Sequence, residues 1–306
     1  MTRAASALGF GTAFVLVWSS GYIAGSLGAR EADPVTLGFW RFAIATVVLG
    51  VAVAVRGPRW PARPRQWLDL LAIGALLQNV QFTGAFAAIG LGMSAGLAAL
   101  ISDASPVVVA VASVVLFGER LRPLQVAGVV LGVAGVCVVV GEGLDLRFGP
   151  AALVAAVVGL AGAAGGTLYQ KAVQDRTDML TATFVQLVGA TATMAPVAAL
   201  HGGFTMPLTP TTVAVVLWLA GIGSILAFVL LFALLRSRSG AEATSLLFLV
   251  PPTTAVLGAL LLAEPLTAAT LLGFGVAAAG VRLVVRRPAR RRAGGRRPAP
   301  LRRRTG

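Results

Sequence analysis

Two ionisable side chains lie inside long apolar stretches of the sequence, where a charge is costly to bury. Arg41 lies about two helical turns into the stretch 34–55, and Asp103 lies near the middle of the stretch 94–117. Charged residues in such surroundings are rare and commonly face a cavity. The aspartate could bind a cationic group or accept a coupling proton, and the arginine could hold a carboxylate. The alternatives are a buried ion pair between the two, neutral partners for each, or an arginine that reaches the membrane interface.

A second polar group lies in the stretch 67–90, which contains Gln78, Asn79 and Gln81. In an α-helix Gln78 and Gln81 share a face, with Phe82 one turn beyond Gln78. Amides beside aromatic rings suit a cavity for a polar organic molecule, although hydrogen bonds between helices would explain them as well. Trp18 and Tyr22 are spaced i, i+4 and are either cavity wall or core. The candidate cavity residues are therefore Trp18, Tyr22, Arg41, Gln78, Asn79, Gln81, Phe82, Asp103 and Gln186.

Membrane-spanning helices are the elements that the composition requires to position these side chains. Of the 306 residues, 57% are hydrophobic and 12% are charged, with a mean hydropathy of +0.88. Soluble domains carry about 25% charged residues, so the composition excludes a soluble enzyme, a disordered chain and a fibre. Ten apolar stretches approach the length that spans a bilayer and predict an all-α polytopic membrane protein. They are 7–27, 34–55, 67–90, 94–117, 124–140, 150–170, 179–200, 211–235, 241–262 and 267–285.

The net charge of +14 raises the question of a nucleic-acid partner. If the N-terminus is cytoplasmic, 21 of the 25 basic residues fall on the cytoplasmic side and two, Arg30 and Arg147, fall outside. This asymmetry predicts a plasma-membrane protein with both termini in the cytoplasm. The arginine-rich segment 286–306 should be disordered and should contact anionic lipids. It has no aromatic residue to stack on bases, so no nucleic-acid partner is expected.

An internal repeat appears when the sequence is shifted by 145 residues. Segments 118–140 and 263–285 then agree at eight of 23 positions, including Glu119 with Glu264, and Pro106 falls opposite Pro251. Five spans form each unit, and because five is odd the second unit has inverted orientation. Such inverted repeats allow alternating access to a site at the membrane midplane. The two units are residues 1–140 and 150–285.

Prolines and glutamates mark equivalent places in the two units. Pro106 and the pair Pro251 and Pro252 interrupt apolar stretches and predict helix kinks that act in gating. Glu119 and Glu264 precede helices, where the helix dipole stabilises a carboxylate. A role of these glutamates in gating or proton transfer is the alternative.

The pattern resembles the EamA family of the drug/metabolite transporter superfamily. The resemblance rests on Phe39-Trp40-Arg41-Phe42 in the second span and on Gly118-Glu119-Arg120-Leu121 running into Gly128 and Gly135. The second half repeats this as Ala263-Glu264-Pro265-Leu266 running into Gly273 and Gly280, with Gln186 at the position of the arginine. The resemblance covers residues 5–285 and implies a ten-helix carrier, often an exporter of amino acids or other metabolites.

The sequence therefore predicts a secondary active transporter that exports small organic metabolites. It has no nucleotide-binding GxxxxGK[ST] motif and no protease or hydrolase motif, so neither ATP-driven transport nor an enzyme is expected. With one cysteine and one histidine, no metal site or other cofactor is expected either. An importer or a lipid-headgroup flippase of the same fold is an alternative. A membrane scaffold that works through its basic tail is an alternative of a different class.

Overall fold

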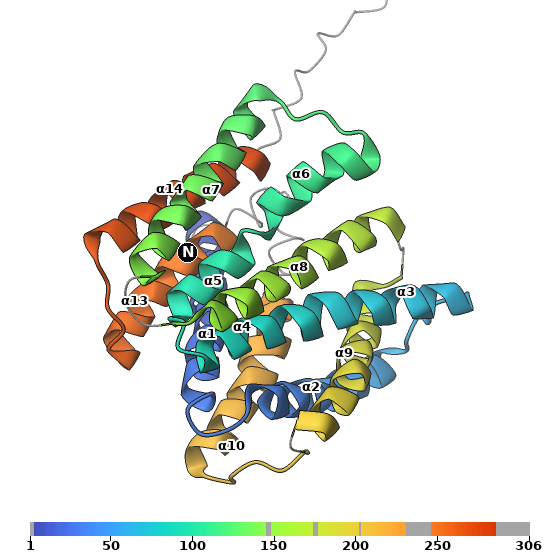
Figure 1. The fold of residues 1–306 in the computed structure, drawn as a ribbon. Coiled ribbons are helices and arrows are strands. Elements are labelled where there is room, and N and C mark those ends of the chain that lie inside the picture. Colours follow the sequence, from blue (N-terminus) through green and yellow to red (C-terminus); the bar gives the residue numbers. More distant parts are fainter. Residues whose placement is uncertain (1–2, 145–147, 174–176, 202, 231–245, 286–306) are drawn as a thin grey trace, which may run out of the picture.

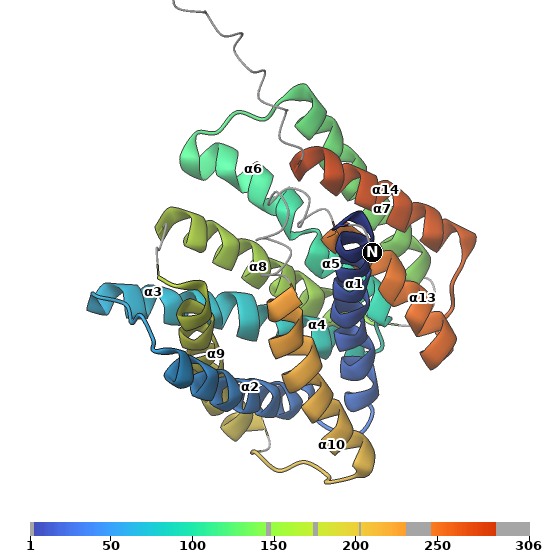
Figure 2. The same cartoon turned by 180° about the vertical axis from the view of Figure 1, so that it is seen from behind.

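The computed structural model consists of helices joined by turns and short loops in the residues it describes, which are 3–144, 148–173, 177–201, 203–230 and 246–285 (Figures 1 and 2). No β-strand occurs in these ranges. The α-helices are α1 (Arg3–Gly28), α2 (Pro34–Arg56), α3 (Pro64–Gly74), α4 (Gln81–Gly90), α5 (Ala95–Asp103), α6 (Ser105–Phe117), α7 (Pro123–Leu144), α8 (Pro150–Val173), α9 (Met179–His201), α10 (Pro210–Leu217), α13 (Val250–Leu262) and α14 (Ala268–Val285). Two π-helices, η1 (Ala75–Val80) and η2 (Trp218–Leu226), and a short 3₁₀-helix, η3 (Leu247–Leu249), continue them.

The helices are long and apolar enough to make this a multi-pass membrane protein. Within the described ranges, nine helical segments reach membrane-spanning length and hydropathy, and Leu247–Leu262 is a shorter apolar helix. The predicted all-α membrane fold is thus confirmed. The predicted ninth span, 241–262, begins outside the described residues. The predicted eighth span, 211–235, ends outside them. The arginine-rich segment 286–306, with its predicted disorder and lipid contacts, also lies outside them.

Proline begins several of these helices because the first helical position needs no backbone N–H donor. Pro34, Pro64 and Pro210 occupy the first turns of α2, α3 and α10. Before α2, the Asp33 carboxylate accepts hydrogen bonds from the amides of Val35 at 2.9 Å and Thr36 at 3.0 Å. This N-cap satisfies donors that would otherwise lack partners and fixes the point where the helix containing Arg41 begins.

The predicted fourth span is two helices rather than one kinked helix. α5 ends at Asp103, α6 begins at Ser105, and Pro106 lies in the first turn of α6. Pro251 has the same place in α13, directly after η3. Proline cannot donate to the preceding turn, so each break leaves backbone carbonyls near the middle of the bundle to find other partners.

The π-helices were not expected from the sequence, and they correct one prediction. η1 contains Gln78 and Asn79 and separates α3 from α4. Because a π-helix bonds i to i+5, the α-helical spacing that placed Gln78 and Gln81 on one face does not apply. Gln78 is buried, whereas Gln81 is half-buried.

The two halves of the chain use matching element boundaries at the 145-residue offset. α2 and α9 have 23 residues each and begin at Pro34 and Met179, while α6 and α13 have 13 residues each. η2 spans the positions equivalent to η1. Thr46 and its equivalent Thr191 share a hydrogen bond of 3.1 Å between their hydroxyls, as two residues beside a two-fold axis would.

The turns after α6 and α13 also match in detail. Gly118 and Ala263 both adopt the left-handed conformation, with φ of 66° and 55°. The amide of Glu119 donates to the Ser113 carbonyl at 3.3 Å, and the amide of Glu264 donates to the equivalent carbonyl, that of Gly258, at 3.2 Å. Ala263 holds a conformation that glycine adopts more easily, so the turn itself imposes this shape.

Helices α7 and α14 pack side by side along a row of glycines (Figures 1 and 2). A Cβ atom added to Gly135 would lie 2.6 Å from the Gly273 carbonyl oxygen, and one added to Gly280 would lie 2.6 Å from that of Gly128. At the offset of 145, Gly280 is the equivalent of Gly135 and Gly128 is the equivalent of Gly273, so the two contacts are the same contact in the two units. The close approach is therefore repeated symmetrically along one helix pair, and it depends on the missing side chains.

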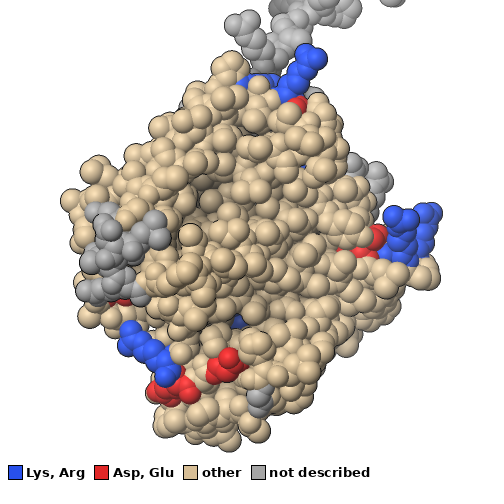
Figure 3. Space-filling view, in the orientation of Figure 1, with Lys and Arg blue, Asp and Glu red and all other residues tan. Residues whose placement is uncertain are grey.

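Charge is concentrated at the ends of the bundle, and a broad uncharged surface lies between them (Figure 3). We call the end where α2, α6 and α8 terminate the basic end. It carries Arg56, Arg59, Arg63, Arg65, Arg120, Arg122 and Lys171. The opposite end, where α1, α4 and α13 terminate, carries Arg30 together with the acidic residues Glu31, Asp33 and Glu264.

Candidate functional site

Arg41 is the largest fully buried side chain of the described residues, with 2% of its surface exposed. Its Nε donates to the Ser224 Oγ at 3.0 Å, and its Nη2 donates to the Gly223 carbonyl at 3.3 Å. Ser224 in turn donates to the Leu219 carbonyl at 2.9 Å. These partners belong to η2, so the wide turn of a π-helix in the second half of the chain holds the arginine of the first half.

Aromatic rings surround the guanidinium of Arg41. Its Cζ lies 4.2 Å from the ring centre of Phe82, 5.3 Å from that of Phe42 and 5.7 Å from that of Phe86. The π faces of such rings stabilise a cation, and the effect is greater where water is excluded. The positive charge of Arg41 is thus supported by aromatic faces and neutral hydrogen-bond acceptors.

The alternative of a buried ion pair between Arg41 and Asp103 is not found. The described part of the chain has two ion pairs, Arg65 with Asp69 and Lys171 with Glu119, and both lie at the basic end. The Nη1 of Arg41 has no hydrogen-bond partner among the described residues although it is buried. One face of the guanidinium is therefore free to donate to an added acceptor such as a carboxylate.

Tyr22 and Asp103 also have buried polar atoms without a partner. Tyr22 in α1 is 2% exposed, and neither its Oη nor the Oδ2 of Asp103 has a hydrogen-bond partner among the described residues. The phenol lies close enough to Asp103 and to Arg41 for electrostatic interaction, and Ser102 lies beside it without a hydrogen bond of normal geometry. Buried polar groups are nearly always paired, so each exception needs an explanation.

Thr254 is the fourth residue of this kind, because its Oγ1 is buried without a partner in the described part of the chain. It lies in α13, which packs against both α1 and α5. Nearby, Ser19 of α1 donates to the carbonyl of Val250 at 3.3 Å. The four unpartnered atoms thus come from α1, α2, α5 and α13, and α1 packs against each of the other three helices.

The space beside Asp103 is small. A cavity of about 20 Å³ is lined by Asp103, Leu100, Pro251, Phe274 and residues of α7 and α14. A buried water needs roughly 10–15 Å³, so this cavity has room for one water molecule. The candidate residues near Asp103 therefore surround a water-sized space in this conformation.

The amide residues lie in two different surroundings. The Nδ2 of Asn79 donates to Thr193 of α9 at 3.0 Å, and its Oδ1 accepts from Thr83 at 2.9 Å. The contact with Thr193 is a hydrogen bond between helices, which the sequence left as an alternative for Asn79, whereas the contact with Thr83 lies within one continuous helical segment. Gln78 and Gln186 are buried, and the Gln186 backbone packs directly against Gly74 where α3 crosses α9.

Trp18 belongs to an aromatic group at the side of the core. It is half-buried, and its ring centre lies 5.4 Å from Phe14 and 6.4 Å from Phe228. Phe86, Ser224 and Thr254 were not among the site residues predicted from the sequence. The i, i+4 spacing of Phe82 and Phe86 could have indicated the first, but nothing in the sequence links Arg41 to residues more than 180 positions away.

At the opposite end, Glu264 faces a cavity of about 660 Å³ that Ser26, Arg30, Ser94, Leu97 and Thr270 also line. Its Oε1 and Oε2 accept from the amide of Ala95 at 3.0 and 3.2 Å. Glu264 therefore caps α5. The sequence had indicated an interaction with α14, the helix that follows Glu264. Burial raises the pKa of Glu264, and the backbone hydrogen bonds from Ala95 and Gly96 oppose this shift.

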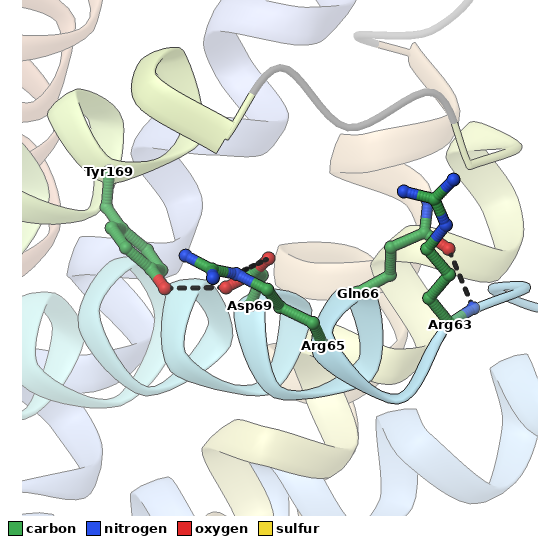
Figure 4. A network of polar contacts seen from close by, with 5 residues as sticks. All are labelled: Arg63, Arg65, Gln66, Asp69 and Tyr169. Carbon is green, nitrogen blue, oxygen red and sulfur yellow. Dashed lines mark hydrogen bonds and ion pairs between the residues drawn. The ribbon is translucent and has the colours of Figure 1, made fainter.

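At the basic end, side-chain contacts join α8 to its neighbours. The Tyr169 hydroxyl donates to Asp69 of α3 at 2.7 Å, and Arg65 lies 4.0 Å from the same carboxylate (Figure 4). Gln66 accepts from the amide of Arg63 at the start of α3.

Glu119 joins α8 to the turn between α6 and α7. Lys171 Nζ lies 2.7 Å from the Glu119 carboxylate and 3.1 Å from the Ser113 Oγ, and 4.9 Å from the ring centre of Phe117. Lys171 is the only lysine of the chain and was not among the predicted site residues. The two equivalent glutamates thus have different partners, a lysine at one end and backbone amides at the other.

The model of the EamA-like transporter family matches this chain twice, at residues 5–141 and 149–286. The chain belongs to the EamA-like transporter family. Members of this family are transporters and not enzymes, and the resemblance noted in the sequence is therefore confirmed.

Relatives extend over most of the chain. A probable amino-acid metabolite efflux pump of Escherichia coli K12 is 29% identical over 272 residues, which cover 85% of this chain and 88% of that protein. An uncharacterized transporter of Archaeoglobus fulgidus is 30% identical, covering 88% and 93%. The uncharacterized inner membrane transporter YedA of E. coli K12 is 28% identical, covering 90% of both. A solved crystal structure with 23% identity covers 92% of this chain and 96% of its own, with a TM-score of 0.62, and shows the same fold.

Proposed function

We propose that this EamA-like transporter exports small organic metabolites, amino acids or similar solutes, by secondary active transport across the plasma membrane. The observation that carries this proposal is the set of four buried polar atoms without a partner among the described residues: Tyr22 Oη, Arg41 Nη1, Asp103 Oδ2 and Thr254 Oγ1. Unsatisfied polar groups in a membrane interior are costly, and a polar solute that pairs with them removes that cost.

The chemistry of these groups fits a solute with an acidic and a basic or hydroxyl group. Arg41 Nη1 can donate to a carboxylate, and its other two nitrogen donors already hold the guanidinium in place. Asp103 and Tyr22 can accept from an ammonium or hydroxyl group, and Asp103 can instead take up a coupling proton. Phe82 and Phe86 supply an apolar wall beside the charge. The relative named as a probable amino-acid metabolite efflux pump supports both the solute class and the direction.

The matching halves support alternating access. The units 1–140 and 150–285 share helix boundaries, left-handed turns, π-helices and a glycine pairing that exchanges under the offset. In an inverted repeat, each unit can adopt the arrangement of the other, which moves the opening from one end to the other. We infer that the central residues are reached in turn from the basic end and from the opposite end.

We further infer the orientation from the distribution of basic residues. The basic end carries most of the described arginines, and the positive-inside rule favours the cytoplasm for an end with this excess. Both termini then lie on the cytoplasmic side. The segment 286–306 adds ten arginines on that side, where anionic lipid headgroups would attract them.

The experiment compares metabolites released by cells that express the protein, its Asp103→Asn variant or neither. Wild-type cells should release one or more small metabolites faster than control cells, and Asp103→Asn should remove the difference at equal membrane level. Asp178→Asn is the matched control, because Asp178 is an exposed carboxylate at the start of α9. Full release by Asp103→Asn would exclude Asp103 from the transport site.

A further inference from the structure

The last turns of α1, at the opposite end of the bundle, are flanked by two cavities. One is the cavity of about 660 Å³, lined by Ser26 of α1 together with Leu262 and Glu264. The other has a volume of about 690 Å³ and is lined by Ala24 of α1 and by Ala214 and neighbouring residues of α10 and η2. The end of α1 therefore has open space on two sides.

The residues 145 positions away occupy the basic end, and there they are in contact. The equivalents of Ser26, Leu262 and Glu264 are Lys171, Phe117 and Glu119. Lys171 reaches Glu119 at 2.7 Å and lies 4.9 Å from the ring centre of Phe117. Where the opposite end has a cavity, the basic end has a long lysine side chain that bridges α8 and the turn after α6.

The second cavity has a counterpart of the same kind. Ala24 and Ala214, which line it, are equivalent to Tyr169 and Asp69. The Tyr169 hydroxyl donates to the Asp69 carboxylate at 2.7 Å and thereby joins α8 to α3 (Figure 4). Two separate pairs of residues thus hold the end of α8 at the basic end. The equivalent positions at the end of α1 line two cavities.

We propose that Lys171 with Glu119 and Tyr169 with Asp69 form a latch that keeps the basic end closed while the opposite end is open. We refer to these four residues as the latch. The proposal builds on the alternating access proposed above, and it assigns the conformation in hand to the state open at the opposite end. Release of the latch allows α8 to shift and a cavity to open at the basic end, while the two cavities at α1 close.

The two latch pairs are accessible to solvent to different degrees. The side chains of Lys171 and Glu119 are 40% and 51% exposed, whereas Asp69 is 7% exposed. Exposed ion pairs contribute little to stability, so the contact between Lys171 and Glu119 costs little free energy to break. Each contact removed should lower the ratio of the described conformer to the alternative by about 2- to 5-fold.

The experiment reads the conformer at the end remote from the latch. In a Cys137→Ser background, Ala29→Cys places the only cysteine in the cavity beside α1, at a half-buried position. A small methanethiosulfonate reagent then labels Ala29→Cys only while that cavity is open. The double variant Lys171→Gln, Tyr169→Phe should label more slowly by about twofold or more, although both changes lie at the basic end.

The control variant is Arg120→Gln, which removes a positive charge from the turn of Glu119 without touching the latch. It should label at the rate of the parent protein. Equal rates for the double variant and the control, with both proteins correctly folded in the membrane, would overturn the proposal, because a merely local role cannot alter labelling at the other end.

A second arm locks the latch. A bifunctional thiol reagent that joins Lys171→Cys to Glu119→Cys should keep the basic end closed and abolish transport, and cleavage of the reagent should restore it. Transport at the full rate by the locked protein would contradict the latch. The labelling arm needs no transported solute, so a failure of the proposed function leaves its result interpretable.

Discussion

The glycine row between α7 and α14 gives a stability prediction that can be worked out from the structure. Gly280 and Gly275 lie in the same helix, but a Cβ at Gly280 would lie 2.6 Å from the Gly128 carbonyl oxygen, whereas nothing lies within 4 Å of one at Gly275. Both substitutions to alanine gain about 0.8–1.0 kcal/mol of helix propensity. This gain cancels when the two variants are compared.

The difference that remains is the cost of overpacking, which is about 1–3 kcal/mol. The obstacle at Gly280 is backbone of α7, which cannot rotate away as a side chain can, so the upper half of this range is expected. Gly135→Ala should behave like Gly280→Ala, because the offset of 145 converts one contact into the other.

Thermal unfolding in detergent, followed by tryptophan fluorescence, measures this difference. We expect Gly275→Ala to unfold at or slightly above the parent temperature and Gly280→Ala and Gly135→Ala to unfold several degrees lower. If Gly280→Ala were as stable as Gly275→Ala, α7 and α14 would not pack as described, and the symmetric pairing would be refuted.

Three further predictions concern single side chains. Arg41→Lys keeps the charge but loses the two directed hydrogen bonds to η2, so the rate of solute transport should fall at least about tenfold, in line with the 1.5–3 kcal/mol of a hydrogen bond to a charged group; a rate like that of the parent would contradict it. Asp33→Ala removes the N-cap of α2 and should lower the free energy of unfolding by about 1 kcal/mol in chemical denaturation, and an unchanged value would contradict that role. Hydrogen bonds from the Thr209 and Thr212 hydroxyls lower the pKa of Glu31, the one from Thr209 having the larger effect. The contribution of Glu31 to stability is therefore present above the ordinary glutamate pKa and is lost as the pH falls through the lowered value. Glu31→Gln should therefore flatten the acid limb of the melting-temperature profile, and a profile unchanged by this substitution would show that another group sets it.

The helical elements of this protein could be predicted from its sequence because their signals are local. Runs of about 20 apolar residues set the spans, and Pro34 and Pro210 mark helix starts through the missing N–H donor. The repeat was visible because Glu119 recurs as Glu264 and Pro106 as Pro251 at one offset. The left-handed turn at Ala263 had no such signal, because only its equivalent, Gly118, is a residue that favours this conformation.

The surroundings of the candidate residues could not be predicted, because they depend on contacts between distant segments. The π-helices η1 and η2 have no sequence signal of their own, yet η2 supplies Ser224 and Gly223 to Arg41. The partner of Glu264 is an amide of α5, 169 positions away, and not the following helix. For Arg41 and for Glu264, the neighbouring sequence indicated one set of partners. The packing of the two halves of the chain provides another.

The central claim, that Arg41 and Asp103 bind a transported solute, is tested most directly by solute exchange in liposomes that contain the purified protein. Liposomes loaded with unlabelled amino acids should take up the matching radiolabelled amino acid by exchange. We predict that exchange is lost in Arg41→Gln and in Asp103→Asn but kept in Asp178→Asn. Exchange at the same rate in all of these variants, or no exchange above protein-free liposomes with any amino acid, would contradict the account.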